Sequence, residues 1–154
     1  MYHQMRKSER ELSKEEAMEI LLQGEYGILS TTGENGIPYG VPVSYAVKGK
    51  KIYFHCAKGV GHKVENMYYQ EQVCFTVVGK TKILPEKFST CYESVIVFGR
   101  AREIFLGKEI ALMALIEKYS PDYLEKGKRY IEKDAGKTGV YEITIEKISG
   151  KARR

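Results

Sequence analysis

Six stretches of this sequence have the residue pattern of β-strands, and they limit the possible folds more than any other feature. They cover residues 26–32, 38–47, 52–57, 72–80, 92–105 and 140–148. Val73, Phe75 and Val77, for example, alternate with the residues of a second face, as in a strand with two unlike sides. We therefore predict a mainly β fold, a six-stranded antiparallel β-barrel with peripheral helices.

The second of these strands contains two prolines. It follows Asn35-Gly36, which is a strong hairpin signal. Pro38 and Pro42 cannot donate a backbone hydrogen bond to a neighbouring strand. We therefore expect this strand to lie at an edge of the sheet or to be bulged.

Helix signals occur at the start of the chain, in its middle and near its end. Ser13 and Glu16 form a capping box at the start of the first predicted helix. Helices are also predicted over residues 62–69 and 108–119, and Pro121 suits the first position of another helix. These helices are expected at the margins of the barrel.

The length of 154 residues suits one domain with a sizeable core. Residues 1–12 are polar and form a predicted N-terminal arm, and residues 13–154 form the single predicted domain. Within it, residues 81–91 are expected to be irregular and residues 149–154 to form a basic tail. No apolar run has the length of a membrane span and the N-terminus is unlike a signal peptide, so we expect a cytoplasmic protein without a membrane partner.

The net charge of +5 suits an anionic ligand or a phosphate-bearing cofactor. It is too small to argue for nucleic acid by itself. Arg100 and Arg102 could lie on a nucleic-acid surface, but the sequence has no ribonucleoprotein motif. A solvated strand face is the favoured interpretation, and no nucleic-acid partner is predicted.

The chain has few candidates for metal or side-chain catalysis. A zinc site would use His55, Cys56, His62 and Cys74. The neighbours His55 and Cys56 point to opposite faces of one strand, which argues against this site, and no metal is predicted. Cys56 and Cys74 are expected to be small core residues. Because no Ser-His-Asp arrangement is evident, we assign any demanding chemistry to a cofactor.

Residues 52–63 offer a place for a phosphate group. They pass from a predicted strand through Gly59 and Gly61 into the predicted helix at residues 62–69. The first amides of a helix lack partners and favour an anion, and Lys58, His62 and Lys63 would add donors and positive charge. The alternative is an ordinary connection with solvated lysines.

Several motifs together resemble one known family. They are IPYGVPVSY at residues 37–45, IYFHCAK at 52–58, GHK at 61–63, YESVIVFG at 92–99 and ISGK at 148–151. In this order they are similar to the pyridoxamine 5′-phosphate oxidase-like flavoproteins, and more narrowly to the nitroimidazole-resistance branch. The resemblance implies a split β-barrel that binds FMN at the interface of a homodimer. Tyr39 stands where the true oxidases have a basic residue, so vitamin B6 oxidation is not the expected activity.

The resemblance also implies which residues contact the flavin. The second strand would meet the ring, the end of the third strand would lie beside the ribityl chain, and the loop would hold the phosphate. Ser94 matches a position that contacts the isoalloxazine in the larger oxidases. The residues implied in cofactor binding are Val41, Pro42, Val43, Ser44, Phe54, His55, Lys58, Gly61, His62, Lys63 and Ser94.

His55 is the candidate catalytic residue, because the matching histidine of the nitroimidazole-resistance branch lies next to the flavin. An imidazole could hydrogen-bond a nitro oxygen or supply a proton. The resulting hypothesis is an FMN-dependent reductase of small electron-poor molecules such as nitroimidazoles and nitroaromatics. The alternative is a flavin- or haem-binding carrier or stress-related protein without turnover. The sequence has no nicotinamide-binding fingerprint, so it does not identify the electron donor.

Overall fold

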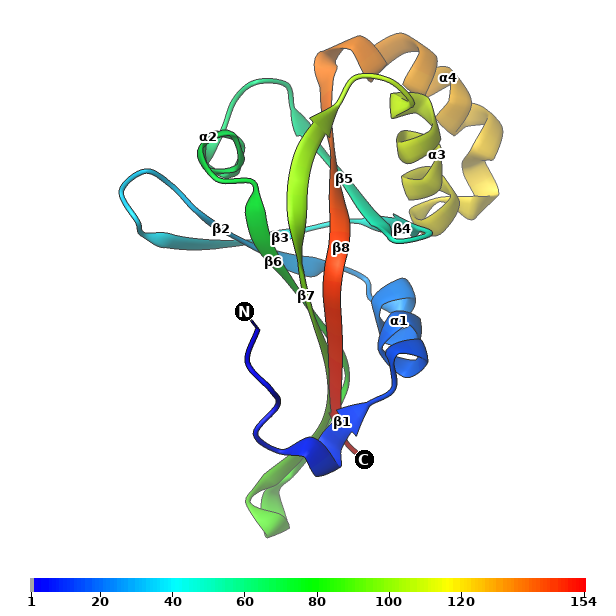
Figure 1. The fold of residues 1–154 in the computed structure, drawn as a ribbon. Helices are drawn as coiled ribbons and strands as arrows, with labels where there is room; N and C mark the ends of the chain where they lie inside the picture. The colour runs from blue at the N-terminus through cyan, green and yellow to red at the C-terminus, as the bar shows by residue number, and fades with distance from the viewer. Residues whose placement is uncertain (1) are drawn as a thin grey trace.

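The computed structural model describes residues 2–154, so Met1 of the predicted N-terminal arm lies outside the described residues. Figure 1 shows a long, strongly curved sheet with helices at its margins. The strands are β1 (Glu11–Leu12), β2 (Gly27–Thr32), β3 (Pro38–Val43), β4 (Ala46–Lys48), β5 (Lys51–Ala57), β6 (Gln72–Leu84), β7 (Ser89–Ile104) and β8 (Thr138–Arg153). The α-helices are α1 (Lys14–Gln23), α2 (His62–Tyr69), α3 (Lys108–Tyr119) and α4 (Leu124–Asp134). Short 3-10 helices are η1 (Ser8–Arg10), η2 (Pro85–Lys87), η3 (Pro121–Tyr123) and η4 (Ala135–Lys137).

The sheet curls into a split barrel. Its strand order is β3-β2-β6-β7-β8-β5-β4, and β1 pairs with β8. β3 and β4 are therefore the opposite edges of the sheet, although only Ser44 and Tyr45 separate them in the chain. Two residues can join these edges only if the sheet bends round on itself. The predicted antiparallel split barrel is confirmed, and its hydrogen-bond ladder stays open between β3 and β4.

The strand count differs from the six predicted strands for two reasons. The second predicted strand, over residues 38–47, is broken at Ser44 and Tyr45 into β3 and β4. In addition, Glu11 and Leu12 of the N-terminal segment pair with Lys151 and Gly150 of β8. The edge position of β3 confirms the prediction from its prolines, because Pro38 and Pro42 pair with β2 on one side only.

The barrel interior is closely packed with large side chains. Tyr45, Phe54, Phe75 and Tyr141 are fully buried there. The Tyr45 and Phe75 rings meet edge to face with centroids 5.0 Å apart, and Phe54 stacks on Tyr141 at 5.5 Å. Leu29 on β2 also lies in this cluster, with no exposed surface. This cluster is the first hydrophobic core.

A second hydrophobic core lies on the other side of β4, β5 and β8. The helices α3 and α4 cover this side (Figure 1). Their buried residues include Leu112, Leu115 and Ile131, which pack with Ala46 and Val140 of the sheet. The molecule is therefore layered, with β5 between the barrel interior and the helices.

Residues 81–91 are not irregular, so that prediction was wrong. β6 and β7 continue to pair from Thr81↔Tyr92 to Leu84↔Ser89 and form a long hairpin that extends away from the helices (Figure 1). Pro85 does not interrupt a strand, because it starts η2 at the tip.

The predicted basic tail was also wrong, since residues 149–153 belong to β8. Arg153 pairs with Tyr92 of β7 in the same ladder. Arg154 then makes ion pairs with Glu93 at 3.2 Å and with Glu16 at 3.3 Å. The residues at the end of β8 do not by themselves indicate a strand. Pairing with β7, which is distant in sequence, extends β8 to Arg153.

Candidate functional site

The loop after β5 has the conformation that its glycines allow. Gly59 has φ 71° and Gly61 has φ 112°, both in the region that favours glycine. Gly61 precedes α2, and its carbonyl accepts from the Glu65 N–H at 3.1 Å. The amides of the first turn of α2 have no partner inside the helix, so they can face a ligand. The predicted passage from strand through glycines into helix is confirmed.

Two contacts fix α2 against β2. The buried Asn66 side chain donates a hydrogen bond to the Thr31 hydroxyl at 3.0 Å. Gly33, after β2, approaches the same side chain so closely that an added Cβ would lie 2.3 Å from Asn66 Oδ1. The start of α2 is therefore held in place, as a site for a phosphate group requires.

A ring stack brings the start of α2 to β3. His62 and Tyr39 have ring centroids 4.0 Å apart and an interplanar angle of 26°. The phosphate-loop candidates Gly61, His62 and Lys63 thus lie beside the strand that carries the ring candidates. Lys58 is exposed on the loop that precedes them.

The candidates in β3, and Ser44 directly after it, divide between two sides of the chain. Val41 and Val43 pack against the barrel core, whereas Pro42 and Ser44 are exposed. Because β3 is an edge strand, backbone groups on its free side have no strand partner. The strand can therefore offer backbone donors and acceptors to a ligand.

The end of α3 clamps the link between β3 and β4. The Tyr45 N–H donates to the Tyr119 hydroxyl at 2.9 Å, and that hydroxyl donates to the Glu25 carbonyl at 2.6 Å. Lys118 Nζ donates to the Tyr45 carbonyl at 2.9 Å and lies 3.6 Å from the centre of the Tyr45 ring. Burial lowers the pKa of Lys118 to about 8. Sequence reasoning missed this clamp, because no local pattern connects Lys118 and Tyr119 with Tyr45.

The side chains of Phe54 and His55 lie on opposite faces of β5. The Phe54 side chain is fully buried in the barrel, so only its backbone could meet a ligand. His55 points to the other face, where its side chain is partly covered and keeps an exposed surface. Partial burial, and next the charge of Lys63, hold the pKa of His55 below its ordinary value. A neutral imidazole can both donate and accept a hydrogen bond.

Ser94 does not join the other candidates within one chain. Its neighbours in sequence and in β7, Val95 and Val97, are fully buried, so Ser94 lies on the outer face of the sheet. There it lines a separate cavity of about 850 Å³ together with residues of the N-terminal segment. Tyr2 of that segment stacks on Phe98, with ring centroids 4.8 Å apart.

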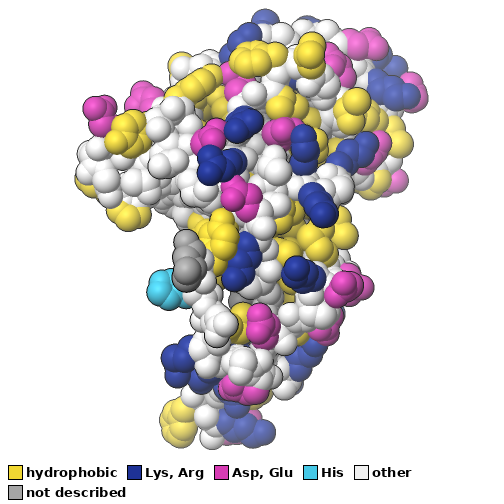
Figure 2. All heavy atoms as spheres, viewed as in Figure 1, with side chains coloured by type: hydrophobic (Ala, Val, Ile, Leu, Met, Phe, Trp, Pro, Cys, Tyr) yellow, Lys and Arg dark blue, Asp and Glu magenta, His cyan; other side chains and the backbone are white. Residues whose placement is uncertain are grey.

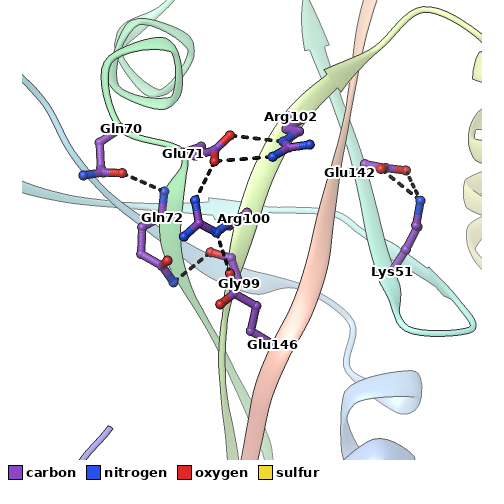
Figure 3. Close-up of polar contacts among 9 residues, drawn as sticks. All are labelled: Lys51, Gln70, Glu71, Gln72, Gly99, Arg100, Arg102, Glu142 and Glu146. Atoms are coloured by element: carbon purple, nitrogen blue, oxygen red, sulfur yellow. Dashed lines mark hydrogen bonds and ion pairs between the residues drawn. The ribbon is translucent and has the colours of Figure 1, made fainter. Parts of the chain in front are cut away.

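The two arginines of β7 are engaged in ion pairs (Figure 3). Arg100 contacts Glu71 at 2.6 Å and Glu146 at 3.0 Å, and Arg102 contacts Glu71 at 3.1 Å. Carboxylates therefore neutralise much of the positive charge on this face. Figure 2 shows basic and acidic side chains interspersed there.

Two other kinds of site are absent from residues 2–154. No group of three or more histidine, cysteine or acidic side chains is arranged to hold a metal ion in this part of the chain. Among the same residues, no helix has the length and apolarity needed to cross a membrane.

Comparison with known proteins identifies the family. The family model for pyridoxamine 5′-phosphate oxidase matches residues 13–152, nearly the whole chain. The chain belongs to the pyridoxamine 5′-phosphate oxidase family. No curated protein sequence matches the chain.

Several solved structures have the same fold as this protein. A candidate 5-nitroimidazole antibiotic resistance protein from Bacteroides thetaiotaomicron is 23% identical, with a TM-score of 0.74 over 92% of this chain and 86% of its own. A flavocytochrome from Azotobacter vinelandii is also 23% identical, with a TM-score of 0.81 over 99% of this chain and 73% of its own. An FAD- and haem-binding protein from Mycobacterium smegmatis is 18% identical, with a TM-score of 0.74 over 92% and 72%.

Proposed function

We propose that this protein binds FMN and reduces small electron-poor molecules such as nitroimidazoles and nitroaromatics. The observation that carries the proposal is the stack between Tyr39 and His62, because it joins an anion-binding helix start to a free sheet edge. A flavin phosphate needs the first feature and the polar edge of a flavin ring needs the second.

The start of α2 fits the phosphate group of FMN. Unpaired amides and the helix dipole favour an anion there. Gly61 leaves the approach open, because no atom of a residue beyond its two chain neighbours lies within 4 Å of its Cβ position. Lys63 and His62 begin the helix, and Lys58 precedes it. Three side chains that can carry positive charge thus belong to the loop and the helix start where the phosphate is expected.

The free edge of β3 fits the ring. Backbone groups of residues 41–44 would hydrogen-bond the polar edge of the isoalloxazine. The clamp by Lys118 and Tyr119 holds Tyr45 and therefore limits the movement of Ser44, the last of these residues. Bound FMN would supply the electron transfer.

His55 is the residue proposed to act on the substrate. Its neutral ring would donate a hydrogen bond to a nitro oxygen, and its protonated form would supply a proton. Replacement of His55 by Ala is expected to preserve FMN binding and to lower the rate of nitro reduction. Equal turnover by this variant would remove His55 from the mechanism.

The proposal includes a homodimer with the flavin between the subunits. Pro42, Ile28, Thr76 and Ile96 are cross-strand neighbours in one row over the outer face of β3, β2, β6 and β7. This row carries no charge, which favours association with a second copy. The second copy would bring its Ser94 toward the flavin, since Ser94 lies apart from the other candidates in one chain. Light scattering with FMN present should give the mass of two chains, and a single-chain mass would contradict this part of the proposal.

The visible spectrum and thermal unfolding test cofactor binding. The purified protein should be yellow or should gain stability with excess FMN, by about 2.7 kcal/mol at a concentration 100 times the Kd. Riboflavin should stabilise it less. A colourless protein without a gain in stability would contradict the proposal.

The second candidate function is a haem- or flavin-binding carrier without turnover. It is favoured by the similarity in fold to a flavocytochrome and to an FAD- and haem-binding protein. A Soret band in place of a flavin spectrum would support haem binding. Failure of the reduced, FMN-loaded protein to convert a nitroimidazole would support the carrier function.

A further inference from the structure

A cavity of about 360 Å³ lies between the end of β5 and the helices α3 and α4. Its walls come from β5, from both helices and from the segment that leads into β8. Leu112, Leu115, Ile116 and Ile131 make it largely apolar. In Figure 1 this region lies where α3 and α4 stand beside the upper end of β5 and β8.

His55 lies at this cavity, on the same face of β5 as Tyr53. The Tyr53 side chain packs against the second hydrophobic core, which α3 and α4 build. The His55 side chain therefore points toward the helical layer and away from the barrel interior. The residue proposed to act in the reaction therefore borders a largely apolar cavity.

Four other lining residues carry polar side-chain groups, and they come from α4 and from the segment that leads into β8: Tyr130, Asp134, Lys137 and Thr138. The Thr138 hydroxyl donates to the Asp134 carbonyl at 3.1 Å. Lys108 Nζ donates to the Ala135 carbonyl at 2.6 Å, which ties α3 to the end of α4. These two bonds tie the helices together at this end of the cavity. The His55 ring is the polar group that β5 contributes to the lining.

The size and lining indicate the class of ligand. Ligand pockets commonly range from about 300 to 1,000 Å³, and an apolar cavity of about 150 Å³ is sufficient for benzene. A cavity of about 360 Å³ therefore suits a single ring with short substituents. The leucine and isoleucine side chains of α3 and α4 favour an uncharged ring between them, and the imidazole favours a hydrogen-bonding substituent.

We infer that this cavity binds an uncharged, single-ring aromatic molecule whose acceptor group contacts His55. The role of the cavity as a substrate pocket rests on the proposed function. In that role an electron-poor ring would reach His55 from the side of α3 and α4. As a binding site it stands on the cavity alone.

Binding can be measured by titrating isotopically labelled protein with nitrobenzene and following the amide resonances. Leu115→Phe and Ala135→Leu both add side-chain volume at the cavity wall. Ala135 is only half buried, so its substitution should disturb the fold less than that of Leu115. Each should weaken nitrobenzene binding at least about tenfold. Ile110→Phe is the matched control, because Ile110 is on the same helix, 61% exposed and outside the cavity lining. It should leave the affinity within about twofold.

A second comparison tests the contact with His55. His55→Leu should weaken nitrobenzene about 2- to 10-fold, the effect of one hydrogen bond, and should leave toluene unchanged. Equal losses for nitrobenzene and toluene would overturn the contact.

The outcomes separate the cavity from the proposed function. The inference is overturned if wild-type protein does not bind nitrobenzene, or if both filled variants bind it as tightly as the wild type. Either result leaves FMN binding untouched. If the protein takes up no FMN but the filled variants lose nitrobenzene, the cavity stands and the proposed function fails.

Discussion

The two hydrophobic cores on either side of β5 differ in how completely they are filled. In the barrel core, Leu29, Phe54 and Tyr141 are buried almost without exposed surface. In the helical layer, Leu112 and Leu115 keep 9% and 6% of their surface and border a cavity of about 360 Å³. The barrel core has the packing that specifies one structure, whereas the helical layer keeps room for a ligand.

Two neighbouring residues of β5 contribute to the two regions, one to the barrel core and the other to the cavity in the helical layer. Phe54 points into the barrel and His55 into the helical layer, because successive side chains of a strand alternate. The register of β5 against β8, where Phe54 pairs with Tyr141, therefore positions the core and the candidate site together.

The largest expected effect comes from matched truncations in the two cores. Leu29→Ala should lower the free energy of unfolding by about 3–5 kcal/mol, and Leu115→Ala by about 2–3 kcal/mol, because the helical layer is already less completely packed. Urea denaturation measures both values. Leu22→Ala, at an exposed position of α1, is the control and should cost less than about 0.5 kcal/mol. Equal losses at the two buried positions would contradict the contrast between the cores.

The next effect concerns Lys63, in the first turn of α2. Lys63→Ala removes a charge beside the expected phosphate without altering either core, and a charge-assisted hydrogen bond contributes about 1.5–3 kcal/mol. FMN affinity should therefore fall about 10- to 100-fold in a fluorescence titration. Riboflavin, which has no phosphate, should bind the variant as it binds the wild type. Lys48→Ala, at the exposed end of β4, controls for loss of charge alone. If both flavins weaken equally, Lys63 supports the loop and contacts no phosphate.

A smaller effect tests the link between the two cores. Lys118 belongs to α3 but lies over Tyr45 of the barrel, and burial lowers its pKa to about 8. The unfolded chain then binds more protons than the folded protein above that pH, so the free energy of unfolding should rise between about pH 8 and 10. The rise should be about 1 kcal/mol, because solvent screens a partly exposed amine.

Urea denaturation across this pH range measures the rise. Lys118→Met should abolish it, while Lys126→Met at an exposed position of α4 should not. An unchanged rise in Lys118→Met would assign it to another group.

The smallest effect is the titration of His55 itself. Its pKa should lie below the ordinary value of about 6.5, and Lys63→Ala should move it upward by removing a nearby charge. Because the folded protein holds this ring neutral more strongly, stability should fall as the pH drops from about 6.5 through the lower pKa. Imidazole resonances in NMR spectra measure the titration. A pKa at or above 6.5 would contradict the placement of His55 in the helical layer.

Local signals in the sequence were sufficient for much of the fold. The capping box at Ser13 forms as predicted, with the Glu16 N–H donating to the Ser13 hydroxyl at 3.1 Å. Pro38 and Pro42 indicated an edge strand, and Gly61 indicated a turn into α2, because each residue restricts or frees the backbone at its own position. The helix α2 begins at His62 and ends at Tyr69, as predicted.

Features that depend on distant partners were not predictable in this way. The hairpin at residues 81–91 and the end of β8 are strands because β6, β7 and β8 pair with one another, and their own residues carry weak signals. The clamp of Lys118 and Tyr119 on Tyr45 joins segments 73 and 74 residues apart. The cavity beside His55 arises from the packing of two helices against β5, which no single stretch of the sequence encodes.

The two-residue link between β3 and β4 limits how the length of this chain can vary. Ser44 and Tyr45 join opposite edges of the sheet, so an insertion or deletion between them cannot be absorbed by a loop. One residue more or less would rotate β3 or β4 and turn its inward side chains outward. Insertions and deletions should instead be tolerated at open turns. One is the turn at Gly49, where no atom beyond the two chain neighbours lies within 4 Å of an added Cβ, and another is the hairpin tip at η2. Relatives of this protein should therefore differ in length at those turns and keep the spacing between Val43 and Ala46 constant.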